Sequence, residues 1–132
     1  MALETMAPLA EIPGVQLISV LNWTIDPMPA AFEGRLIDFS PELKSLDDTA
    51  ALIETLDLVI PVDTSVAHLA GALGKPTWLL LHDFADCRWG LHEETSYWYP
   101  DMRLWRQREA GDWGGVIAAV AEALRAKVQA AP

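Results

Sequence analysis

The chain has 132 residues, and its nine Lys and Arg stand against nineteen Asp and Glu, which leaves a formal net charge of −10 with neutral histidines. A content of 52% apolar and 21% charged residues excludes a disordered chain, and the length predicts one domain over residues 1–132. The acidic balance argues against a nucleic-acid partner, which needs clustered Lys and Arg. No apolar run is long enough for a transmembrane segment, and the N-terminus lacks the basic start of a signal peptide. Cys87 has no partner for a disulfide. We therefore expect a cytoplasmic protein.

Helix-like and strand-like patterns alternate along the chain. The expected elements are a helix over 3–12, strands over 15–21 and 35–39, a helix over 48–56 capped by Asp47 or Asp48, a strand over 58–62, a helix over 64–73, strands over 77–81 and 102–106, and a last helix capped by Asp112. Strands that are separated by helices imply right-handed crossovers, which make neighbouring strands parallel. The sequence therefore predicts an α/β fold, a Rossmann-like three-layer sandwich with a mainly parallel sheet.

The segment that follows the 58–62 strand carries the clearest functional signal. This strand is apolar throughout, as expected for a strand covered on both faces, and Asp63-Thr64-Ser65 turns directly into the next helix. Ligands of open α/β sheets bind where strands end, and a helix start offers free N–H groups and a partial positive charge. Such a start could hold a phosphate or diphosphate without a lysine. The plainer interpretation is that Asp63 and Thr64 only cap the helix.

Two further side chains affect this interpretation. A carboxylate at Asp63 would repel a phosphate unless it pointed away or capped the helix. His68 follows Thr64 by one helical turn, so its ring either faces the same corner or packs against a neighbour. The histidines and the cysteine match no common zinc spacing, so we expect no metal site at His68, His82, Cys87 and His92.

The run DTSVAHLAGALGKP, from Asp63 to Pro76, resembles the nucleotide-binding motif of family 9 glycosyltransferases. These include the ADP-heptose lipopolysaccharide heptosyltransferases, and the sequence is most similar to the form fused to tetratricopeptide repeats. The resemblance covers most of residues 12–126 and continues through Cys87-Arg88-Trp89, Ser96-Tyr97-Trp98-Tyr99-Pro100, Met102-Arg103-Leu104-Trp105-Arg106-Gln107 and Gly111-Asp112-Trp113.

The resemblance implies that the chain is half of a GT-B fold, the C-terminal domain that binds the donor. It implies that the diphosphate of a nucleotide sugar lies against Asp63, Thr64, Ser65, Val66 and His68. It implies a cleft lined by Trp89, Trp98, Tyr99 and Pro100. Enzymes of this family need no metal or other cofactor, and the resemblance assigns no catalytic residue in this chain.

The sequence departs from the family pattern at its N-terminal side. It shows no counterpart of the N-terminal Rossmann domain, nor of the strand and polar loop that open the donor domain. One wall of a two-wall cleft cannot orient both substrates, so we expect glycosyl transfer only with a second domain, a partner protein or a homodimer mate. We expect strand 15–21 to pair with strand 58–62, unless another chain covers the gap. The alternative function is a non-catalytic module, derived from the same fold, that binds a protein or a small anion.

Overall fold

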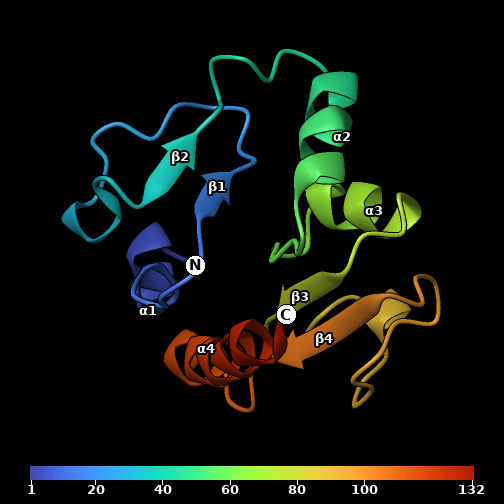
Figure 1. Ribbon diagram of the computed structural model, residues 1–132. Helices are drawn as coiled ribbons and strands as arrows, with labels where there is room; N and C mark the ends of the chain where they lie inside the picture. Colours follow the sequence, from blue (N-terminus) through green and yellow to red (C-terminus); the bar gives the residue numbers. More distant parts are fainter. The chain divides into compact units, whose positions relative to one another are not determined.

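The computed structural model describes residues 1–132 and shows helices alternating with short strands (Figure 1). The elements are η1 (Leu3–Met6), α1 (Ala7–Ala10), β1 (Leu17–Ser19), η2 (Ala30–Phe32), β2 (Leu36–Asp38), α2 (Leu46–Thr55), α3 (Ser65–Ala72), β3 (Thr77–Leu81), η3 (Cys87–Trp89), β4 (Met102–Arg106) and α4 (Trp113–Ala130). Their contacts define two compact units, one of Met1–Lys44 with Trp113–Pro132 and the other of Ser45–Asp112. The α/β class is confirmed, whereas the three-layer sandwich and the single domain over 1–132 stay predictions.

The first unit combines the N-terminal segment with the last helix. Strands β1 and β2 form a two-stranded parallel sheet with Leu17 opposite Leu36. Helix α4 contacts α1, and its buried residues form one helical stripe: Val116, Ile117, Val120, Ala121 and Leu124. Between α1 and β1 the chain turns at Gly14, whose φ of 81° favours glycine. The ladder partner of β1 is β2, and the predicted pairing of 15–21 with 58–62, which would join the two units, stays a prediction.

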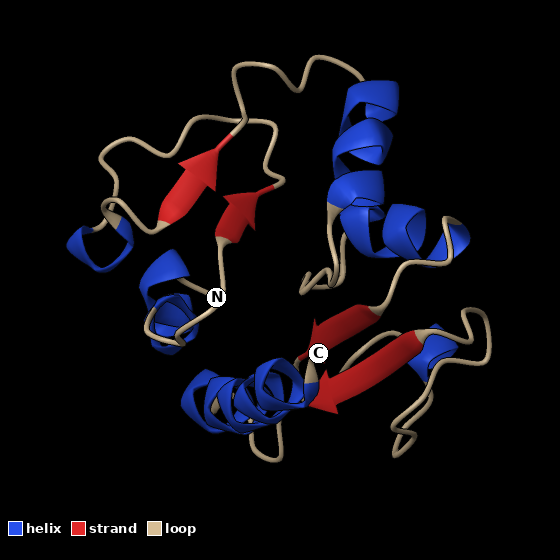
Figure 2. Ribbon diagram, in the orientation of Figure 1, coloured by secondary structure: helices blue, strands red, loops and turns tan.

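The second unit begins with α2 and α3 and holds the other sheet (Figure 2). Helix α2 starts earlier than predicted, because Ser45 and not Asp47 or Asp48 is the capping residue. The Ser45 Oγ accepts a hydrogen bond of 3.1 Å from the backbone N–H of Asp48, which satisfies one of the free donors at the helix start.

The sheet of this unit pairs β3 with β4 in parallel, with Thr77 opposite Met102. The predicted 58–62 strand lies on the other side of β3 but makes only two isolated bridges, Val59 with Thr77 and Val62 with Leu80. The Val59 and Pro61 carbonyls accept hydrogen bonds of 2.8 Å from β3 amides. The next bond of the ladder would need an N–H at Pro61, which proline lacks, so the prediction of a continuous strand is wrong here.

Helix α3 covers one face of the β3–β4 sheet. Buried side chains from α3, from both strands and from η3 form a common core, made of Ala67, Leu79, Leu81, Trp89, Met102 and Leu104, with Ala85 and Tyr99 packed against it. Because the strands are parallel, the residues that follow their carboxyl ends lie at one edge of the sheet, together with the start of α3. This edge is where the sequence predicts ligand binding.

Candidate functional site

The start of α3 leaves backbone N–H groups without protein acceptors. Thr64 is the N-cap residue with extended backbone, φ −145° and ψ 176°, and its side chain accepts no hydrogen bond from the helix. Its hydroxyl instead donates to the carbonyl of Val62 at 3.3 Å. The first helix-start amide that is bonded is that of Ala67, which donates to the Thr64 carbonyl at 3.0 Å. The amides of Ser65 and Val66 therefore remain available, since Ser65 is exposed and Val66 half-buried.

The carboxylate of Asp63 is directed toward Trp89 and does not cap the helix. Its Oδ2 accepts a hydrogen bond of 2.9 Å from the indole Nε1 of Trp89. Trp89 is only 1% exposed, so the indole that binds Asp63 belongs to the core of the unit. The Asp63 carboxylate thus points away from the helix start. An aspartate in this orientation does not exclude a phosphate at the free amides.

His68 lies between two aromatic rings and an arginine. Its ring stacks on Trp89 with centroids 5.2 Å apart, and its Nδ1 lies 2.8 Å from the hydroxyl oxygen of Tyr99. Its Nε2 lies 3.3 Å from Nη1 of Arg88. A guanidinium can only donate, so in the neutral ring Nε2 accepts and Nδ1–H donates to Tyr99. These contacts fix the orientation of the half-buried His68 ring.

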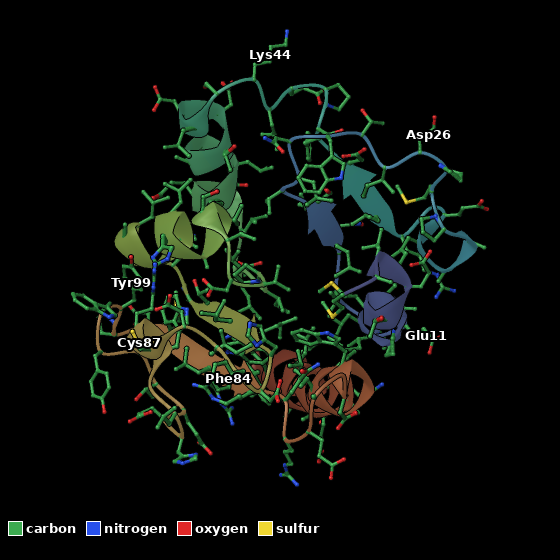
Figure 3. The ribbon with its side chains drawn as sticks, turned by 180° about the vertical axis from the view of Figure 1, so that it is seen from behind. Glu11, Asp26, Lys44, Phe84, Cys87 and Tyr99 are labelled. Carbon is green, nitrogen blue, oxygen red and sulfur yellow. The ribbon has the colours of Figure 1, made fainter.

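Tyr99 lies beside α3 (Figure 3). It can lie so close only because residue 71 is glycine. A Cβ at Gly71 would stand 2.5 Å from Cγ of the Tyr99 ring, which is closer than real side chains approach. The glycine thus allows the close approach that brings the Tyr99 hydroxyl to His68.

Arg88 and Asp86 form the ion pair of this site. Arg88 Nε lies 2.9 Å from Asp86 Oδ1, and Nη2 lies 3.3 Å from Oδ2, so the carboxylate is held by one edge of the guanidinium. These side-chain bonds, followed by a bond from the Arg88 amide, lower the pKa of Asp86 from 3.8 to about 2. The same pairing with Asp86 raises the pKa of Arg88. Sequence reasoning did not select either residue, although Arg88 belongs to the Cys87-Arg88-Trp89 motif.

The remaining predicted cleft residues lie at different depths. Trp98 is 67% exposed, and its indole Nε1 donates to the Arg88 carbonyl at 3.2 Å. Tyr99 is half-buried beside His68, whereas Pro100 is exposed and borders a shallow depression. The other lining residues of this depression are Glu94, Thr95, Asp101, Met102 and Arg103. The structure therefore brings Asp63, His68, Trp89 and Tyr99 into one cluster and leaves Pro100 outside it.

Two classes of feature are absent from the described chain. No three side chains of His, Cys, Asp or Glu come together as metal ligands would. None of the helices is both long enough and apolar enough to span a membrane.

Comparison with known proteins supports the resemblance that the motifs predicted. Residues 30–86 match glycosyltransferase family 9 (heptosyltransferase), a stretch that includes β2, α2, the start of α3 and β3. A protein of Caulobacter vibrioides, FlbA, is 39% identical over 82 residues, which is 61% of this chain and 13% of the length of FlbA. No solved structure matches the chain. Together the two matches support a family 9 glycosyltransferase-like domain in this chain.

Proposed function

We propose that this domain binds the diphosphate of a nucleoside-diphosphate sugar at the start of α3, as the donor-binding part of a glycosyltransferase. The observation that carries the proposal is the hydrogen bond from Trp89 to Asp63, which turns the Asp63 carboxylate away from the free amides of Ser65 and Val66. Free amides and the helix dipole together favour an anion.

Arg88 offers further hydrogen-bond donors near the helix start, although its charge is paired with Asp86. Arg88 has five N–H groups and uses three of them, two on Asp86 and one on His68, so two remain for an anion. In a glycosyl transfer the diphosphate leaves with the electrons of the glycosidic bond. Hydrogen-bond donors that already lie beside the oxygens of the leaving diphosphate would stabilise its negative charge without a metal.

We propose further that transfer needs a second domain or a partner protein. The family 9 match ends at residue 86, and the chain spans 13% of the length of its relative FlbA. The proposed site supplies groups for the leaving diphosphate but no carboxylate or imidazole free to activate an acceptor hydroxyl, since His68 is engaged at both ring nitrogens.

The proposal is tested by titrating the full chain with ADP and UDP while following tryptophan fluorescence and the melting temperature. Saturable binding of either nucleotide raises the melting temperature by mass action. The Ser65→Glu variant places a carboxylate at the first position of α3, where it stabilises the helix but competes with a phosphate, so we expect it to fold and to lose the shift.

Ala51→Glu serves as the matched control, because it adds the same charge on the exposed face of α2 in the same unit. We expect this variant to bind as the unmodified chain does. Equal binding by Ser65→Glu would move the site away from α3. No shift with either nucleotide would favour the alternative, a module that binds a protein.

A further inference from the structure

The carboxyl end of β4 carries three consecutive side chains with unpaired buried donors. Trp105 Nε1, Arg106 Nε and Gln107 Nε2 are buried and have no hydrogen-bond acceptor, and Gln107 is only 4% exposed. Buried polar groups in proteins are nearly always paired, so each of these N–H groups needs an explanation. All three groups are donors, so each needs an acceptor such as an oxygen atom.

Arg106 differs from its two neighbours in the face of the sheet that it occupies. Side chains alternate along a strand, so Arg106 shares its face with Met102 and Leu104, which pack in the core beside Trp89. The Nη2 of Arg106 donates to the Trp89 carbonyl at 3.0 Å, which agrees with a place on the face of the sheet that carries Trp89. Trp105 and Gln107 project from the opposite face. Only Arg106 therefore points toward the site described above.

Arg106 is also a half-buried cation without a counter-ion. The ion pair of this unit joins Arg88 to Asp86, and no carboxylate reaches Arg106. Removing a guanidinium from water costs free energy, and one hydrogen bond to a carbonyl does not offset this cost. A negatively charged ligand group would supply both the missing charge and the acceptor for Nε.

The position of Arg106 agrees with the proposed site. It is the last residue of β4, at the edge where the parallel strands end and α3 begins. Trp89 connects the two places, because its indole binds Asp63 and its carbonyl binds Arg106. We propose that Arg106 binds a phosphate oxygen of the nucleotide ligand and neutralises its charge, an inference that rests on the proposed function.

The test compares Arg106→Met with the unmodified full chain for binding of ADP and of inorganic pyrophosphate. Loss of a charge-assisted hydrogen bond weakens binding roughly ten- to a hundredfold, so we expect a decrease of that size for both ligands. Because Arg106→Met also removes an unpaired, half-buried charge, its melting temperature without ligand should equal or exceed that of the unmodified chain. A purely structural arginine would show the reverse, a lower melting temperature and unchanged affinity.

Arg103→Met is the matched control. It lies on the same strand but is exposed, with its guanidinium over the Trp105 ring at 4.1 Å on the opposite face. We expect it to keep its affinity for ADP. If Arg106→Met fails to fold, Arg106→Lys keeps the charge but cannot offer the same fork of donors, and a threefold or larger loss for pyrophosphate still supports the proposal.

The outcomes separate this inference from the proposed function. ADP binding that is equal in Arg106→Met and the unmodified chain overturns the role of Arg106 and leaves the site at α3 intact. No binding of ADP, UDP or pyrophosphate by the unmodified chain overturns both. Arg106-dependent binding of glucuronate without binding of pyrophosphate would assign a carboxylate ligand and overturn the phosphate assignment.

Discussion

Trp89 contacts two polar residues of the candidate site and the proposed ligand-binding Arg106. It contacts Asp63 through its indole N–H, Arg106 through its carbonyl oxygen and His68 through its ring face. A buried indole carries a large apolar surface and one donor, so it can lie in a core and still orient a carboxylate at the surface. At the residue scale, the arrangement of this corner therefore depends on a side chain that is almost entirely buried.

Gly71 provides a sharp test of the contact between α3 and Tyr99. In Gly71→Ala the new Cβ forces the Tyr99 ring away, and we expect the free energy of unfolding to fall by about 1 kcal/mol, because overpacking outweighs the helix propensity of alanine. In a Tyr99→Ala background the clash is gone, and the same substitution should stabilise the chain. Chemical denaturation of the four variants measures this reversal, and additive effects would contradict it.

The Asp86–Arg88 pair predicts how acid acts on this site. Since the pKa of Asp86 is lowered from 3.8 to about 2, its contribution to folding is complete above pH 3.8 and is lost as the pH falls through about 2. In Arg88→Met the main cause of the shift is removed, so the pKa of Asp86 should return toward 3.8. Titration of the Asp86 carboxyl signal by NMR measures both values, and an unchanged pKa in the variant would contradict the ion pair.

At the scale of elements, the apolar patterns of the sequence predict several helices and strands correctly. They fail where a single residue removes a hydrogen bond between strands. The helices and strands expected at 64–73, 77–81 and 102–106 are present within one residue of their predicted limits. The 58–62 segment departs because Pro61 cannot donate to β3, although its two bridges keep it beside that strand. The position of the 58–62 segment beside β3 was thus predictable. The gap in its hydrogen bonds to β3 results from the N–H that Pro61 lacks.

The start of α2 can be checked in the same way. Ser45→Ala removes the oxygen that accepts the Asp48 amide, and we expect the free energy of unfolding to fall by about 1 kcal/mol. Asp47→Asn only removes one acidic side chain from the first turn, so its cost should be a few tenths of a kcal/mol. Urea denaturation distinguishes the two variants, and a larger effect of Asp47→Asn would favour the cap that the sequence pattern predicted.

At the scale of the whole molecule, the chain forms two compact units, and both termini belong to the first one. The second unit, Ser45–Asp112, is continuous in sequence and contains every predicted site residue. It also contains most of the stretch that matches glycosyltransferase family 9. The family relationship and the candidate site thus lie largely in one contiguous half of the chain.

The sequence by itself determined the α/β class, the resemblance to family 9 and the segment in which the candidate site is proposed, because these depend on residue spacings of a few positions and on short motifs. The tertiary structure alone decided which side chains meet there. Trp89 donates to Asp63 across 26 positions, His68 contacts Tyr99 across 31, and Arg106 reaches the Trp89 carbonyl across 17. Such contacts depend on the path of the irregular segment between β3 and β4, because no hydrophobic periodicity predicts the conformation of that segment. Only the folded structure therefore shows that Asp63 points away from the helix start and that Arg106 lacks a counter-ion.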